Sequence, residues 1–119
     1  MMYEQSEQIA FNSWMCLANP KVLWTATCGG LRTTWKQAVN MKRMGYKKGI
    51  CDVLIFEPRG KYHGLCIEMK KSMEQGKGIV SQEQLQWLHE LGERGYKAVV
   101  CYGCEEAIKV VSDYILKGE

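Results

Sequence analysis

The stretch from Gly49 to Lys70 constrains the fold of this chain more than any other segment. It contains two apolar runs, GICDVLIF and LCIEMK, separated by EPRGKYHG, which is rich in turn-forming residues. Short apolar runs around a turn predict the two strands of a β-hairpin. Both runs carry charged residues that a buried strand normally avoids: Asp52 opens the first, and Glu68 and Lys70 close the second. Since Glu68 and Lys70 are two residues apart, their side chains leave the sheet on the same face.

An aspartate, a glutamate and a lysine at one end of a hairpin suit a metal-dependent hydrolase. Magnesium prefers oxygen ligands and keeps several waters, so two carboxylates and a carbonyl suffice as protein ligands. Asp52 and Glu68 supply the carboxylates, and the backbone carbonyl of Met69 is the third candidate. Lys70 then orients or helps deprotonate the attacking water, while the metal lowers the pKa of that water. The alternative is a solvated ion pair of Glu68 and Lys70 on an exposed strand, and the aspartate on the preceding strand counts against it.

The remaining segments predict an α/β domain. With 119 residues the chain has room for one domain with a modest core, and we expect residues 1–119 to form it. Periodicity and capping residues predict helices over Tyr3 to about Leu17, Thr33 or Thr34 to about Met44, Ser81 to Gly95 and Glu105 to Lys117. Further strands are expected at Lys21–Thr27 and, buried, at Tyr96–Tyr102, with a loop at Lys71–Gly78. This order predicts a mixed central sheet flanked by helices, with an antiparallel hairpin and a parallel pair across the Ser81 helix.

Basic residues gather directly upstream of Asp52. They are interleaved with Trp35 and Tyr46, and they are Arg32, Lys36, Lys42, Arg43, Lys47 and Lys48. Local clusters, rather than the mild net charge of +3, attract polyanions. The cluster therefore predicts contact with a polyphosphate substrate beside the acidic residues. The alternative is a solvated helix face with an ordinary share of lysine.

Two further positions each have a structural and a functional interpretation. In the first expected helix, Ala10, Trp14 and Leu17 lie at helical spacing, and Glu4 is in the first turn, where the helix dipole favours acids. Gln84 lies three residues after Ser81, where it completes a capping box. The same first turn can face the entrance of the site.

At this point the residues resemble a known family. GICDVLIF followed by YHGLCIEMK resembles the PD-(D/E)xK nuclease motif, and the wider pattern resembles its VRR-NUC branch. The match covers nearly the whole chain, including the Gly-Gly before the basic helix and the SQEQLQWL helix. The resemblance implies a restriction-endonuclease-like core in a single VRR-NUC-like domain. By similarity Asp52, Glu68 and Lys70 take the catalytic positions, Glu4 matches the acid of the first helix, and Gln84 matches the glutamine after the motif.

The resemblance also implies a function. It predicts an endonuclease that uses Mg²⁺, with Mn²⁺ able to substitute, and that cuts branched DNA, including four-way junctions, in phage replication or repair. Small stand-alone members of the family dimerise, so a homodimer is expected. No stretch is long and apolar enough to span a bilayer and the start of the chain lacks a leader pattern, so the expected location is the cytoplasm, that of the host cell for a phage protein. The alternative is a module of the same fold that binds DNA without cutting it.

The six cysteines leave one other class of protein open, a small zinc or redox protein. Cys51, Cys66 and Cys101 lie in apolar runs, which predicts buried free thiols. Cys101 and Cys104 form a CxxC motif that would suit a zinc or redox protein, but no second pair has matching spacing. Cys51 also stands where the resembled family has a proline before the aspartate. Because that proline shapes only the backbone, we expect slightly altered geometry and unchanged chemistry.

Overall fold

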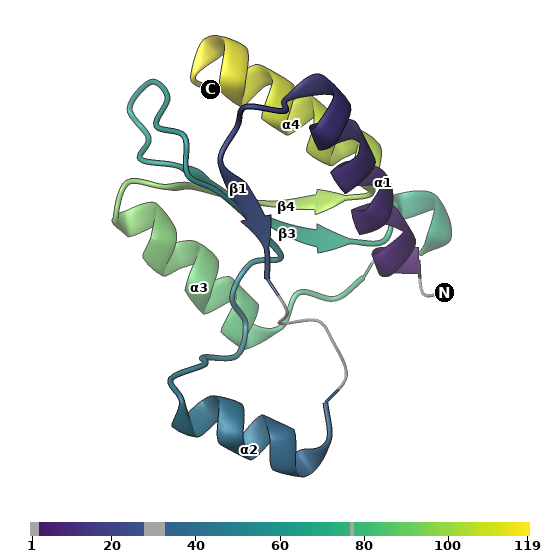
Figure 1. Cartoon of the computed structure of the whole chain (residues 1–119), viewed down its shortest axis with the longest axis vertical. Coiled ribbons are helices and arrows are strands. Elements are labelled where there is room, and N and C mark those ends of the chain that lie inside the picture. The colour runs from purple at the N-terminus through teal and green to yellow at the C-terminus, as the bar shows by residue number, and fades with distance from the viewer. Residues whose placement is uncertain (1–2, 28–32, 77) are drawn as a thin grey trace.

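The computed structural model describes residues 3–27, 33–76 and 78–119, without the side chains of residues 3, 4 and 75. The helices are α1 (Tyr3–Ala18), α2 (Trp35–Arg43), α3 (Gln82–Glu93) and α4 (Cys104–Lys117), and the strands are β1 (Trp24–Ala26), β2 (Val53–Ile55), β3 (Leu65–Lys70) and β4 (Lys97–Tyr102). The segment predicted as a loop after β3 contains a short 3₁₀ helix, η1 (Met73–Gln75). The predicted order of helices and strands is confirmed (Figure 1).

The strands form one mixed sheet in the order β1-β2-β3-β4. β1 and β2 pair antiparallel, as do β2 and β3, whereas β3 and β4 pair parallel. The hairpin and the parallel pair joined through α3 therefore agree with the prediction. β1 and β2 are each shorter than predicted, with three residues apiece. The prediction of a buried β4 is wrong except at Cys101, because β4 is an edge strand and its other residues are only half-buried.

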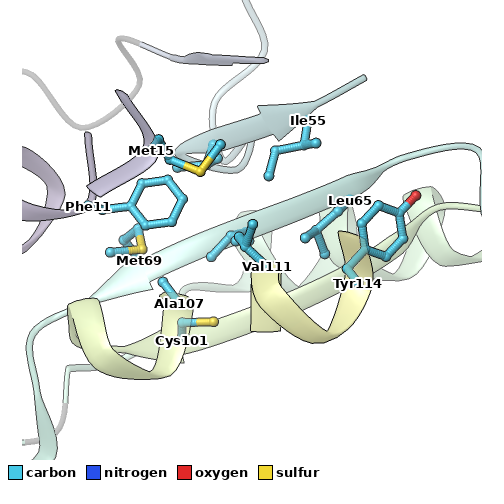
Figure 2. Packing of buried hydrophobic residues seen from close by; sticks show 11 residues of the cluster. Phe11, Met15, Ile55, Leu65, Met69, Cys101, Ala107, Val111 and Tyr114 are labelled. Atoms are coloured by element: carbon cyan, nitrogen blue, oxygen red, sulfur yellow. The ribbon is translucent and has the colours of Figure 1, made fainter. Parts of the chain in front are cut away.

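The hydrophobic core lies between one face of the sheet and the helices α1 and α4, which pack against each other (Figure 1). Figure 2 shows Phe11 and Met15 of α1 beside Met69 of β3, with Val111 of α4 in the same cluster. The predicted apolar seam of α1 is therefore shifted by one residue. Leu17 is 86% exposed, whereas Phe11 and Met15 are fully buried. Both seams have helical spacing, and packing against the sheet selects the second one.

The opposite face of the sheet carries the charged residues. Leu65, Ile67 and Met69 point into the core, so the alternation of β3 sends Glu68 and Lys70 to the other face. Helix α3 packs on β3 and β4 from that side. The two faces of β3 thus serve different purposes: one completes the core, and the other holds charged groups beneath the start of α3.

Candidate active site

Three charged side chains meet at the C-terminal end of β3. The last paired residues of the hairpin, Val53 and Ile67, place Asp52 opposite Glu68. The Nζ of Lys70 lies 3.7 Å from Oε2 of Glu68. The structure therefore brings together Asp52, Glu68 and Lys70.

Burial distinguishes this group from a surface ion pair. Glu68 is 2% exposed and Lys70 is 7% exposed. Removing two charges from water costs several kcal/mol per ion, and the attraction between them does not always repay that cost. A solvated ion pair on an exposed strand, the alternative raised by the sequence, is therefore excluded. The chain keeps a buried charged pair at the end of its central strand, which is typical of functional sites.

Met69 links Asp52 to β3 through the backbone. The side chain of Met69 is buried in the core (Figure 2), while its N–H donates a 2.8 Å hydrogen bond to Oδ2 of Asp52. The N–H and the C=O of one strand residue point to the same side of the strand. The carbonyl of Met69 therefore also faces the side on which Asp52 lies.

These groups form an oxygen-rich set of donors. The two carboxylates and the carbonyl of Met69 are the hard ligands that magnesium and manganese accept, and water completes such sites. Among the described residues no group of three or more His, Cys, Asp and Glu side chains gathers to hold a metal. A cation at this place would therefore rely on two carboxylates and a carbonyl, as the sequence predicts, and the donor set fits it.

Gln84 acts as a helix cap and also contacts the site. Its Oε1 accepts a 2.9 Å hydrogen bond from the backbone N–H of Ser81, and the hydroxyl of Ser81 accepts one from the N–H of Gln84. Its Nε2 donates a 2.9 Å hydrogen bond to Oε2 of Glu68. The capping role and the position at the site are therefore compatible, because the amide oxygen of Gln84 caps the helix and its amide nitrogen contacts Glu68.

Helix α3 also supports the segment that leads into Asp52. The indole N–H of Trp87 donates a 3.0 Å hydrogen bond to the carbonyl of Lys48. Gly49 has a φ of +99°, and a Cβ there would lie 2.7 Å from the carbonyl carbon of Glu83. Only glycine fits this close approach without strain. The hydrogen bond from Trp87 was not expected from the sequence, since residues 39 apart share no local signal.

Thr27 holds the same segment from the other side. Its N–H donates to the carbonyl of Asp52 and its hydroxyl donates to the carbonyl of Cys51, both at 2.8 Å. Asp52 thus lies between two anchored pieces of backbone. Thr27 was predicted only as the end of a strand.

Helix α1 carries the predicted site residue Glu4 and a second acid, Glu7. Glu4 is in the first turn of α1, and its side chain lies outside the described residues. Glu7, one turn further, accepts a hydrogen bond from the backbone N–H of Cys104 at the start of α4. This carboxylate therefore lies at the positive end of α4. The contact fixes the start of α1 beside the end of β4.

The predicted DNA-contacting residues lie apart from the core. Lys36, Lys42, Arg43 and Lys47 are exposed on α2 and the segment after it. Lys48 forms an ion pair with Glu83 at 3.8 Å. Arg32 lies outside the described residues.

The described cysteines are free thiols, and the predicted burial of Cys51, Cys66 and Cys101 is confirmed. Burial, followed by nearby negative charge that includes Glu68, raises the pKa of Cys51 to about 12. Burial also raises the pKa of Cys101 to about 12 and raises that of Cys104. Metal binding and thiol exchange need the thiolate. Cys101 is fully buried, and among the described residues no further His, Cys, Asp or Glu joins the CxxC pair to complete a zinc site.

The histidine of the hairpin has a structural setting. His63 donates its backbone N–H to the carbonyl of Gly95, and its ring packs edge-on against Tyr96. It lies near the N-terminal end of β3, whereas the charged group lies at the C-terminal end. His63 is therefore not part of the candidate site.

The structure thus defines a mixed α/β domain with a buried charged site at the end of its central hairpin. The model of the VRR-NUC domain family matches residues 3–105, and the chain therefore belongs to this family, whose domain is generally a nuclease domain with DNA as its partner. A solved structure described as a VRR_NUC domain protein is 30% identical, with a TM-score of 0.80, and the match covers 97% of this chain and 89% of that chain. No curated protein sequence matches the chain. Among the described residues no helix is long and apolar enough to cross a membrane.

Proposed function

We propose that residues 1–119 form a single metal-dependent DNA endonuclease domain of the PD-(D/E)xK superfamily, of the phage and bacterial stand-alone type. The observation that carries the proposal is the buried Glu68–Lys70 pair beside Asp52, with the amide of Gln84 bound to Glu68. A module that only binds DNA has no need to keep this costly pair in its interior.

Each residue has a role in this proposal. Asp52, Glu68 and the carbonyl of Met69 would hold Mg²⁺, or Mn²⁺ in its place. When bound, such a cation supplies positive charge against the scissile phosphate and acidifies water. The ammonium group of Lys70 donates hydrogen bonds that orient the attacking water. Gln84 keeps the carboxylate of Glu68 in one orientation.

Glu4 is the remaining acid of the proposed site. The contact between Glu7 and the start of α4 supports this, because it holds the N-terminal part of α1 close to the end of the sheet where Asp52 and Glu68 lie. Glu4 precedes Glu7 by three residues on the same helix.

The substrate in this proposal is branched DNA, including four-way junctions, cut during phage replication or repair in the cytoplasm of the host. Basic residues directly upstream of Asp52 support a polyanionic substrate: they are Arg32, Lys36, Lys42, Arg43, Lys47 and Lys48. A homodimer is part of the proposal, since one protomer of 119 residues offers little surface for reading a branch.

Cleavage of labelled linear, flap and four-way DNA tests the proposal. Asp52→Asn keeps an oxygen that can accept the hydrogen bond from Met69 but removes the charge, and Lys70→Ala removes the ammonium. Each should lower the rate at least about 100-fold, the usual effect of losing one group that stabilises charge in a transition state. EDTA should abolish cutting, and Mg²⁺ or Mn²⁺ should restore it. Asp113→Asn and Lys109→Ala break an exposed ion pair on α4 and should cut like the wild type.

Each contrary outcome has a clear meaning. Equal cutting by the wild type and both site variants would place the chemistry elsewhere. DNA binding without cutting of any substrate would favour the non-cleaving module. Zinc that is bound in the purified protein and released when the thiols are blocked would favour a zinc or redox protein based on the CxxC motif.

A further inference from the structure

Within the part of the chain that the structure describes, helix α2 does not pack extensively against another helix or strand. It has nine residues, buries none of them and lies apart from the sheet and the other helices (Figure 1). A capping box between Thr34 and Gln37 stabilises its first turn. Isolated helices shorter than about 12 residues are nevertheless marginal in water, because stability comes mainly from packing. A bound partner would supply the packing that the chain does not.

The charge of this region identifies the kind of partner. We name residues 33–48 the basic arm. It contains five basic residues and no acidic one. Within the part of the chain that the structure describes, Lys36, Lys42, Arg43 and Lys47 form no ion pair. An exposed, unpaired row of cations is complementary to a polyanion, whereas a second basic arm would repel it.

One side chain of the arm is unsuited to contact with phosphate alone. Trp35 is 83% exposed at the first position of α2, and Ala38 and Val39 follow it on the same face. An indole gains about 1–3 kcal/mol by stacking on a nucleic-acid base. Inside a continuous duplex both faces of every base are already covered, so this gain is open only where bases are unpaired or end a stack.

The arm is held close to the candidate site. At its C-terminal end Lys48 accepts the hydrogen bond from Trp87, immediately before Gly49, Ile50, Cys51 and Asp52. The C-terminal end of the arm is therefore anchored four residues before Asp52, so nucleic acid that binds along the arm can reach the candidate site.

We infer that the basic arm binds DNA at a point where base stacking is interrupted, with Trp35 stacking on the exposed base and the lysines contacting the flanking phosphates. This inference rests on the proposed function and makes it more specific, because it assigns recognition of a branch or gap to one residue. The arm, rather than the metal site, distinguishes interrupted from continuous DNA.

Binding in EDTA tests the inference without cleavage. Fluorescence anisotropy is measured with a continuous duplex and with a duplex of equal total charge that contains a short unpaired loop. Trp35→Ala should weaken binding to the looped DNA about 5- to 150-fold, the range for losing one stacked base, and binding to the continuous duplex less than about twofold. Trp35→Phe should recover part of the loss. Met44→Ala removes another highly exposed apolar side chain of the arm and should change neither affinity.

Lys42→Ala tests the electrostatic contribution to DNA binding separately from stacking by Trp35. It should weaken binding to both DNAs equally and lower the slope of log K against log salt by about one. Circular dichroism and sedimentation of each variant accompany the binding data.

Four results would overturn the inference. Equal loss on both DNAs for Trp35→Ala would make Trp35 a general contact. A wild-type dimer that becomes a monomer in Trp35→Ala would show that a second copy covers α2. If the wild type cuts DNA and Trp35→Ala leaves both affinities unchanged, the inference fails while the proposed function stands. If the wild type neither binds nor cuts any DNA, both fail.

Discussion

Gln84→Glu tests the support of the candidate site most directly. The variant keeps an oxygen that can accept the hydrogen bond from Ser81, so the cap of α3 survives. It replaces the amide nitrogen, which donates to Oε2 of Glu68 at 2.9 Å, by a second carboxylate oxygen. A favourable contact in a buried place thus becomes a repulsion.

The size of the effect follows from two contributions. A hydrogen bond to a charged acceptor is worth about 1.5–3 kcal/mol. Two carboxylates about 4 Å apart repel by about 4 kcal/mol at an effective dielectric constant of 20. Uptake of a proton by one carboxyl limits the total, so we expect Gln84→Glu to lose about 2–4 kcal/mol of unfolding free energy at pH 8 in EDTA. Repulsion raises the pKa of the carboxyl pair in the folded state, so the lost stability should return as the pH falls and one group is protonated.

The same helix offers a matched control. Gln86 donates its Nε2 to Oε2 of Glu90 at 3.2 Å, but this pair is exposed to solvent. Gln86→Glu creates the same kind of carboxylate pair in water and should cost less than about 0.5 kcal/mol. Urea unfolding of both variants and the wild type, at pH 8 and at pH 5, gives the comparison. Equal losses for the two variants, or a Gln84→Glu deficit that does not change with pH, would refute the argument that burial and charge at Glu68 set the effect.

Two further predictions concern the backbone before Asp52 and the buried thiols. Gly49→Ala should destabilise the protein by at least about 1 kcal/mol more than Gly45→Ala. Both residues have positive φ, but only at Gly49 would the added Cβ meet another atom, the carbonyl carbon of Glu83 at 2.7 Å. Equal midpoints of urea unfolding for the two variants would contradict this. The pKa of Cys51 is raised from 9.0 to about 12, so folding binds a proton between these values and stability should fall above about pH 9, by up to about 1.4 kcal/mol per pH unit. Unfolding under reducing conditions at pH 8 and pH 10 measures this loss, which should shrink in Cys51→Ala and persist in Cys16→Ala, where the thiol is exposed.

The hairpin and its charged face could be predicted because their signals are local. Two apolar runs around a turn define antiparallel strands, and alternation along LCIEMK assigns Glu68 and Lys70 to one face. The capping box of α3 is equally local, with Ser81 and Gln84 three residues apart. Burial of the charged pair was not predictable in this way, since it depends on where α3 crosses the sheet.

The supporting contacts depend on distant pairs and left no sequence signal. Glu7 contacts the start of α4 across 97 residues, and Thr27 holds Cys51 across 24. Helical periodicity also could not choose between two apolar seams of α1. The sheet buries Phe11 and Met15 and leaves Leu17 in solvent. Composition and spacing define elements, whereas the assembled sheet decides which of their faces is inside.

The two carboxylates of the candidate site are supported by the same part of α3. Gln84 in its first turn binds Glu68, and Trp87 in its second turn binds the backbone of Lys48, which leads into Asp52. A shift of the whole helix therefore moves both supports together, whereas a change in one side chain moves a single carboxylate. Ligands of a cation must keep their spacing within a few tenths of an ångström. One rigid helix that contacts Glu68 directly and also the segment before Asp52 suits this requirement of the proposed metal site. The basic arm is joined to the same helix through Lys48, so in the proposed function DNA bound to the arm is positioned relative to both carboxylates.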